Sequence, residues 1–249
     1  MATVRTDDRH YAAIAAALRE TTGSAATYRP ADMAAAVAQA CGEAQKAAWD
    51  TFWDEFQTKG ARISYDSGFY GPGWTDVNFV PKYDIQPLDI SYMFAESQIT
   101  DLAGILQRQG VLLDTSKASS FGYAFFRSTI THVPKIDTRG ASAPSALGSI
   151  FYLATKLETI DELVLKEDGS QTFSNAFTSC SALKNIRITG CIGQNITFTG
   201  VPLTHDSLLS VLNALKPGVG GKVYLGSSNM AKLTEAEQTI ATEKGWTLV

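Results

Sequence analysis

The hydrophobic positions of the first sixty residues recur every three or four residues, which is the period of an α-helix. The pattern over residues 7–20 predicts a short helix, with Asp7 or Asp8 as its N-cap. Pro30 begins a longer predicted helix that can run unbroken to Lys59, where Gly60 ends it. The apolar stripe of this second helix consists of Met33, Val37, Cys41, Ala44, Ala48, Phe52 and Phe56.

The length of the second helix predicts self-association. At 1.5 Å per residue, roughly 30 residues make a helix about 45 Å long, which the rest of the domain does not easily cover. We therefore expect the segment to attach the protein to partners and to oligomerise, with a trimer as the favoured state. The alternative is a helical hairpin folded back on its own domain. The residues expected to mediate attachment are Met33, Val37, Ala44, Ala48, Trp49, Phe52, Trp53 and Phe56.

Beyond Gly60 the helical period disappears, and a repeat follows. Four phenylalanines are separated by 31, 26 and 26 residues. An aliphatic residue follows each phenylalanine at the fifth or sixth position, and another at the eighth or ninth. The expected repeat core is Phe94, Ile99, Leu102, Phe125, Ile130, Val133, Phe151, Leu157, Ile160, Phe177, Leu183 and Ile186.

This repeat predicts a stack of similar coils. One coil alone cannot bury its phenylalanine and aliphatic side chains, whereas coils stacked at a strand spacing of about 4.8 Å align them into ladders. We expect the aliphatic run to be the strand, the polar segments to turn the corners, and the phenylalanines to form one stack. A degenerate last coil is expected through Cys191, Ile196, Phe198 and Val201.

The period stops at Pro202, and the last segment predicts a cover for the open end of the stack. Thr204 and Thr234 are expected N-caps of two helices, and KVYLG and WTLV are expected strands. The predicted fold class is α+β. It comprises a helical hairpin or coiled-coil segment (1–60), an aromatic and glycine-rich N-terminal cap (61–92), a short solenoid of parallel β coils (93–202) and an α/β C-terminal cap (203–249).

Composition and charge restrict the class of partner. The 249 residues are 45% hydrophobic with a net charge of −4, and Lys and Arg are not concentrated anywhere, so nucleic acid is not an expected ligand. The longest near-apolar stretches fall short of the roughly 20 residues that cross a bilayer, and the N-terminus lacks the pattern of a signal peptide. No CxxC pair is present, and the cysteines Cys41, Cys180 and Cys191 are expected to be buried in a protein from a reducing compartment.

The sequence predicts no catalytic residue, no cofactor and no metal site. His10, His132 and His205 are scattered, and PGVGGKV lacks the Ser or Thr that follows the lysine of a phosphate loop. The acidic pairs Asp161–Glu162 and Glu167–Asp168 are either solvated surface or a glycosidase pair.

A second candidate surface is aromatic. Tyr65, Phe69, Tyr70 and Trp74 either form a platform for sugar rings or shield the open edge of the first coil.

Several segments resemble a known family. FxxSxITxVPxIDT and FTSCSALKNIRI resemble the BspA-like leucine-rich repeats of bacterial and phage surface proteins. The tail from LTHDSLLSVLNALKP to the C-terminus and the segment ISYDSGFYGPGWTDVNFVPKYDIQP are similar to the flanks of such repeats in phages and prophages of gut anaerobes. YAAIAAALRETTGSAATYRPADMAAAV resembles the helical attachment segment of phage tail and baseplate proteins. The chain departs from the family in having a cysteine at the usual position after the phenylalanine only once, at Cys180.

The resemblance implies a leucine-rich-repeat solenoid and a non-enzymatic virion component assembled in the host cytoplasm. Its expected partners are other virion or tail proteins, bound through the N-terminal helices, and a host-surface glycan or protein. Three alternatives stay open: an architectural decoration protein of the baseplate or capsid, a bacterial cell-surface adhesin, and a carbohydrate-degrading tail enzyme.

Overall fold

The computed structural model describes residues 69–77, 79–81 and 84–249, all of which belong to one compact unit, Gly60–Val249. Both predicted N-terminal helices lie outside the described residues, as do His10 and Tyr65. The same holds for the expected attachment residues Met33, Val37, Ala44, Ala48, Trp49, Phe52, Trp53 and Phe56, and for Cys41.

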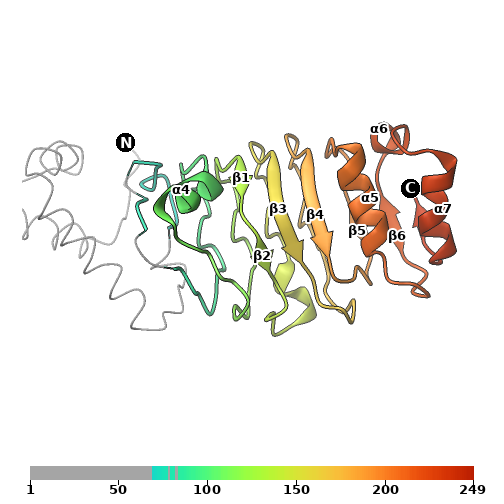
Figure 1. The fold of residues 1–249 in the computed structure, drawn as a ribbon, viewed down its shortest axis with the longest axis horizontal. Coiled ribbons are helices and arrows are strands. Elements are labelled where there is room, and N and C mark those ends of the chain that lie inside the picture. Colours follow the sequence, from blue (N-terminus) through green and yellow to red (C-terminus); the bar gives the residue numbers. More distant parts are fainter. Residues whose placement is uncertain (1–68, 78, 82–83) are drawn as a thin grey trace, which may run out of the picture. The chain divides into compact units, whose positions relative to one another are not determined.

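The described part mixes helices with parallel sheets (Figure 1). In the first sheet the central strand β3 pairs in parallel with β1 and β2 on one side and with β4 on the other. The second sheet has the order β5-β6-β7, also parallel. The elements are α4 (Leu102–Gln109), β1 (His132–Val133), β2 (Ile136–Asp137), the 3-10 helix η1 (Pro144–Leu147), β3 (Thr159–Val164), β4 (Asn185–Thr189), β5 (Ile196–Thr197), α5 (His205–Ala214), β6 (Lys222–Tyr224), α6 (Ser227–Met230), α7 (Glu235–Glu243) and β7 (Thr247–Leu248).

The four phenylalanines of the repeat form one continuous stack in the core. Successive ring centroids from Phe94 through Phe125 and Phe151 to Phe177 are 5.4, 5.2 and 5.7 Å apart, with interplanar angles of 22° or less. The stack continues at both ends, because Phe69 lies 5.3 Å from Phe94 and the tilted ring of Phe198 lies 4.8 Å from Phe177. The expectation of a single stack is therefore confirmed, and Phe69 is a member that the repeat pattern did not include.

The backbone around each phenylalanine links one repeat to the next. The N–H of Phe94 donates to the carbonyl of Ala124, and those of Phe125 and Phe151 donate to the equivalent carbonyls of the following repeats, at 2.8 to 3.0 Å. The residues two positions before and after each phenylalanine donate in the same direction in the first three repeats. The backbone of these flanking residues has the left-handed conformation (φ 50–65°), although none of them is glycine. They are Tyr92, Glu96, Tyr123, Arg127, Ser149, Leu153, Asn175 and Ser179.

Polar side chains fix the corners that follow the strands. Asp114, Asp137 and Asp168 each accept a hydrogen bond from the backbone N–H two residues later, at 2.9 to 3.1 Å. This Asx turn is a common way for aspartate to reverse the chain.

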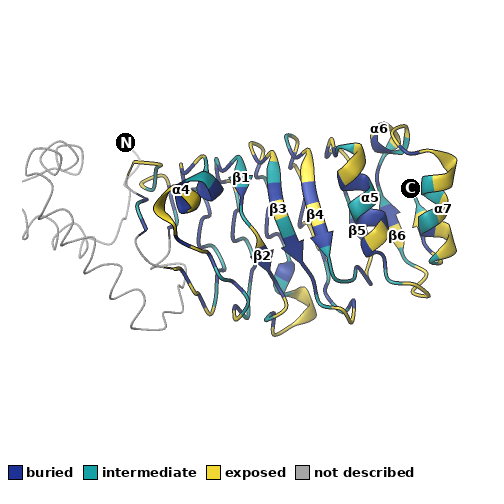
Figure 2. Ribbon diagram, viewed as in Figure 1, coloured by how far each residue is buried: buried dark blue, intermediate teal, exposed yellow. Residues whose placement is uncertain are grey.

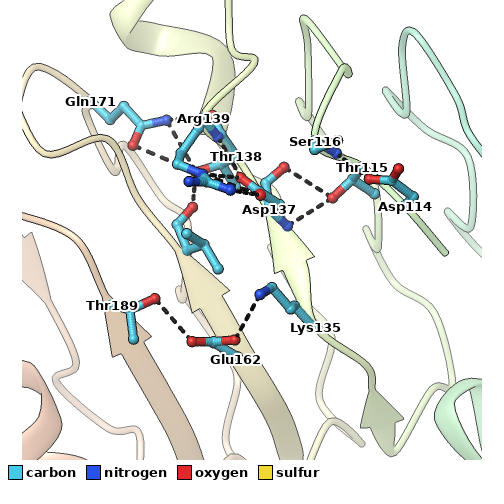
Figure 3. A network of polar contacts seen from close by, with 11 residues as sticks. Asp114, Thr115, Ser116, Lys135, Asp137, Thr138, Arg139, Glu162, Gln171 and Thr189 are labelled. Carbon is cyan, nitrogen blue, oxygen red and sulfur yellow. Dashed lines mark hydrogen bonds and ion pairs between the residues drawn. The ribbon is translucent and has the colours of Figure 1, made fainter. Parts of the chain in front are cut away.

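A buried polar network connects the corners of neighbouring repeats (Figure 3). Thr115 Oγ1 donates to the Asp137 carbonyl and accepts from the Asp137 N–H, at 2.9 and 2.8 Å. Thr138 Oγ1 donates to the Val164 carbonyl at 2.6 Å, and Gln171 Nε2 donates to the Thr138 carbonyl at 2.9 Å. Since buried polar groups need partners, these contacts fix the register of adjacent repeats.

In the first repeat, a helix lies where a strand was expected. The prediction of a strand at Leu102 is wrong: this residue begins α4, because Asp101 caps the helix through the Gly104 N–H at 2.8 Å and the left-handed Gly110 ends it. Leu102 is still buried, and α4 contacts β1.

Helix α5 covers the outer edge of β4. Ser207 Oγ accepts a hydrogen bond from the Ile186 N–H at 2.9 Å, and Ser210 Oγ accepts from the Ile188 N–H at 2.8 Å. Two serines on the helix thus replace the backbone carbonyls that another strand would supply.

The expected C-terminal elements are present, with one difference at a cap. Thr234 forms a capping box with Glu237 at the start of α7, and both expected strands lie within the second sheet as β6 and β7. Thr204 is the N-cap of α5 by position, but its hydroxyl donates to the Lys184 carbonyl instead of accepting from the helix backbone.

Candidate binding surface

Strands β1, β3 and β4 lie between α4 and α5 (Figure 1). Their outward residues, with those of the Pro134–Lys135 link, form a polar surface that we call the strand face. Exposed and buried positions alternate along β4, so that its inward residues reach the core while its outward residues meet solvent (Figure 2). The strand face consists of His132, Lys135, Asp161, Glu162, Asn185 and Arg187.

A β-bulge places two carboxylates side by side on this face. Ile160 pairs with Ile186 and Leu163 with Ile188, so Asp161 and Glu162 together lie opposite the single residue Arg187. Strict alternation would send adjacent residues to opposite faces, and the bulge removes that constraint. The acidic pair noted in the sequence is therefore assembled by an irregularity that the sequence pattern did not predict.

Glu162 is held in the ionised state by its neighbours. Its carboxylate lies 3.2 Å from Lys135 Nζ and accepts a hydrogen bond from Thr189 Oγ1 at 3.1 Å (Figure 3). Arg187 Nε lies 3.9 Å from the same carboxylate. Partial burial favours the neutral acid, but the contacts with Lys135 and Thr189 outweigh it and lower the pKa of Glu162.

Asp161 is the centre of a second polar group. His132 Nε2 lies 2.7 Å from Asp161 Oδ1, and His132 Nδ1 lies 3.7 Å from Asp101 Oδ1 at the start of α4. These side chains are 38–50% exposed, so solvent reaches all three. His132 therefore lies between two acids.

Two shallow hollows, of about 610 and 580 Å³, meet at Asp161. The first lies between β3, β4 and α5, where Arg187, Asn185 and Asn213 line it. The second lies between α4 and β1, where Leu106 and Leu112 form an apolar wall, and Leu112 is 66% exposed. The strand face thus offers charged groups in its middle and an apolar side at α4, which suits binding of an extended polar ligand.

The aromatic candidates separate into core and surface. Phe69 is fully buried, so it has no face available for a sugar ring and belongs to the stack. Trp74 is half-buried with its ring 4.9 Å from Phe69 in an edge-on arrangement, and the Tyr70 hydroxyl donates to Glu96 at 3.1 Å. These contacts correspond to the shielding alternative.

The expected repeat core is buried throughout. The largest exposed fraction among its members is 3%, at Ile186. The members are Phe94, Ile99, Leu102, Phe125, Ile130, Val133, Phe151, Leu157, Ile160, Phe177, Leu183 and Ile186.

Sequence reasoning missed a half-exposed aromatic group on the turns around the stack. The ring of Tyr92 stacks on Tyr123 at 5.0 Å, and the ring of Phe126 stacks on Tyr152 at 5.7 Å. Arg127 lies 5.0 Å above the Phe126 ring. The signal was present, because these residues occur two positions before or one after a repeat phenylalanine.

The two described cysteines differ. Cys180 is buried, its thiol donates to the Phe151 carbonyl at 3.1 Å, and burial raises its pKa to about 12. Cys191 is half-exposed, with its sulfur 3.7 Å from Glu167, so the expectation that it is buried is wrong.

Within residues 69–77, 79–81 and 84–249, no cluster of three or more His, Cys, Asp or Glu side chains is arranged to hold a metal ion. In the same described ranges, no helix has the length and hydrophobicity needed to cross a membrane.

Comparison with known proteins adds no relative from which a role could be transferred. The chain matched no family model, no curated protein and no solved structure.

Proposed function

We propose that the protein is a non-enzymatic binding protein whose strand face receives a ligand from the surface of a host cell. The observation that carries the proposal is the face itself, where Glu162, Lys135 and Arg187 form an ordered row of charges between two helices. Such a row favours complementary polar ligands and gives specificity more than raw affinity.

The state of the acids supports binding over catalysis. A glycosidase needs one carboxylic acid with a raised pKa to protonate its leaving group. The pKa of Glu162 is instead lowered, because Lys135 and Thr189 stabilise its charge against the cost of burial. Glu162 therefore suits ion pairing.

The same proposal extends to architecture and location. In it, the stacked repeats form a leucine-rich-repeat solenoid of the BspA-like type, and the first sixty residues attach and oligomerise the protein on a phage or tail-like particle. The parallel pairing and the phenylalanine stack support the first part. The resemblance of the N-terminal and C-terminal segments supports the second.

The binding role is tested with full-length protein carrying a fluorescent label. Cells of a panel of gut anaerobes are incubated with wild type and with the charge-reversed variant Asp161→Lys/Arg187→Glu, and bound label is measured by flow cytometry. We expect attachment to at least one strain, and a loss of about tenfold or more in the variant, because like charges then face the ligand.

The matched control is Glu243→Lys/Lys222→Glu, which reverses one acid and one base at exposed positions away from the strand face. It should attach like wild type. Attachment to no strain, together with an image of the particle in which the strand face is buried against another subunit, would replace the binding role by an architectural one.

A further inference from the structure

One aromatic column on the turns ends abruptly at the fourth repeat. Phe126 and Tyr152 follow the stack phenylalanines by one position, and their rings stack at 5.7 Å with an interplanar angle of 19°. The next residue of the column is Thr178, whose carbonyl accepts from the Leu153 N–H at 3.0 Å and so lies in register with the others. Since threonine has no ring, the outer face of the half-exposed Tyr152 ring lacks the aromatic neighbour that Phe126 has in Tyr152.

The backbone ladder ends at the same turn. In the first three repeats, three N–H groups around each phenylalanine donate to carbonyls of the following repeat. In the fourth repeat the equivalent N–H groups of Asn175, Phe177 and Ser179 make no hydrogen bond within the described chain. The interval to the next stacked ring, Phe198, falls to 21 residues, so the following repeat does not supply the matching carbonyls.

The surroundings of this turn are polar, uncharged and open. Asn175 and Ser179 are exposed, Thr178 is half-exposed, and their side chains form no hydrogen bond in the part of the chain that the structure describes. The N–H groups of Asn175 and Ser179 belong to exposed residues, so a ligand acceptor can replace water on them, whereas Phe177 is only 1% exposed.

We propose that the turn Asn175–Ser179, together with the outer face of Tyr152, is a binding site for a neutral saccharide that carries acetamido groups. The pyranose ring takes the place of the missing ring above Thr178, with its C–H face on Tyr152. Acetamido carbonyls accept from the exposed N–H groups of Asn175 and Ser179, in place of the separate peptide carbonyls that accept from the equivalent groups in the first three repeats. The site is separate from the strand face and goes beyond the proposed function.

The test uses full-length ¹⁵N-labelled protein and N-acetylglucosamine trimer as the probe. We expect the amide resonances of Asn175, Phe177 and Ser179 to shift on titration, with a dissociation constant on the order of 1 mM. Glucose trimer, which has the same β-1,4-linked rings without acetamido groups, should bind about tenfold more weakly. Equal binding of the two trimers, or no shift at these amides, would overturn the proposal.

Two variants distinguish a loss of saccharide binding at this site from a loss of folding. Thr178→Tyr extends the aromatic column as Tyr152 does in the third repeat, so it should fold and should weaken binding about tenfold or more by filling the slot. Tyr92→Leu removes a half-exposed ring from the other column and should bind like wild type. Wild-type affinity in Thr178→Tyr contradicts the proposed site.

The source of the saccharide is distinguished with two solid supports. Full-length wild type and Thr178→Tyr are incubated with insoluble peptidoglycan and with mucin-coated beads. If one of the two materials retains wild type but not Thr178→Tyr, the result favours the proposed site and identifies the source of the saccharide. Equal retention of both proteins would contradict the proposed site. Cell attachment that is unchanged in Thr178→Tyr while trimer binding is lost leaves the strand-face proposal standing.

Discussion

Individual aspartate carboxylates stabilise the corners of the repeats through hydrogen bonds. Asp137 is 7% exposed and forms a bidentate pair with Arg139, whose Nε and Nη2 lie 3.0 and 2.6 Å from its oxygens. Burial raises the pKa of this carboxyl, but the hydrogen bonds from the Arg139 side chain and backbone outweigh it and lower the pKa overall. The ionised form is therefore the one that stabilises the fold.

Replacing Asp137 by asparagine should lower the free energy of unfolding by about 1–3 kcal/mol at pH 7, since a charged hydrogen-bonded pair is lost. The folded-state pKa is lowered, so the stabilisation is complete above the ordinary aspartate value of about 3.9 and disappears as the pH falls below it. Urea unfolding of wild type and variant between pH 7 and pH 3 measures the difference. Asp206→Asn, at a fully exposed side chain, is the control, and an equal loss there would contradict the role of Asp137.

The two described thiols should differ in reactivity. Iodoacetamide should label Cys191 in the native protein and leave Cys180 unlabelled, because the latter is buried and its pKa is raised to about 12. Burial first, and then the charge of Glu167, raise the pKa of Cys191, so Glu167→Gln should speed its labelling. Peptide mass spectrometry measures both rates. A Cys180 that reacts as fast as Cys191 would be incompatible with its buried position.

At the scale of elements, α5 takes the place of a further strand at the edge of β4. Ser207 is buried, and its Oγ is the acceptor for the Ile186 N–H. We expect Ser207→Ala to lower the free energy of unfolding by about 1–3 kcal/mol, because a buried donor loses its partner. Thermal and urea unfolding measure the effect, with the exposed Ser227→Ala as the control. If Ser207→Ala unfolds like wild type, water or a shift of α5 satisfies the edge instead.

The sequence predicts the elements of this molecule unevenly, for physical reasons. The recurrence of phenylalanine every 26 to 31 residues is a reliable signal, because similar units bury such side chains by stacking them against one another. The aliphatic spacing after Phe94 is compatible with a strand and with a helix. The helix α4 forms because the Asp101 side chain caps its first turn. The bulge at Asp161–Glu162 leaves no trace in a pattern of alternating positions.

The candidate site was harder to predict than the core. The sequence left two roles open for Tyr65, Phe69, Tyr70 and Trp74, sugar binding or shielding of the first coil. In the structure Phe69 belongs to the stack, and the Trp74 ring packs edge-on against it. The strand face depends on which outward positions of β1, β3 and β4 become neighbours, and that depends on the register. The coil architecture and the host-binding role stay predictions.

At the scale of the whole molecule, stability should depend on the continuity of the stack. Phe151 lies between two stacked rings and is fully buried, so Phe151→Ala should cost about 3–5 kcal/mol of unfolding free energy. Phe126→Ala, at a half-exposed ring in the same region, is the matched control and should cost less. Equal costs in denaturant titrations would show that the stack contributes no more than surface packing.

The oligomeric state belongs to the same scale. Light scattering should give a larger assembly, favoured as a trimer, for the full chain, and a monomer for a chain that begins at Gly60, because the predicted stripe from Met33 to Phe56 is the expected interface. Equal monomeric masses for the two proteins would end the proposal that the first sixty residues oligomerise.

At the turns around Phe94, Phe125 and Phe151, the backbone hydrogen bonds between repeats point the same way, from each phenylalanine turn to the one after it. An array with a direction can lengthen by inserting identical units in its interior, since every inserted unit meets a donor on one side and an acceptor on the other. Duplication of the 26 residues from Phe125 to Ile150 would thus add one layer and move the two ends apart by about one ring spacing, 5.2 to 5.7 Å. The length of the stack is therefore adjustable in fixed steps.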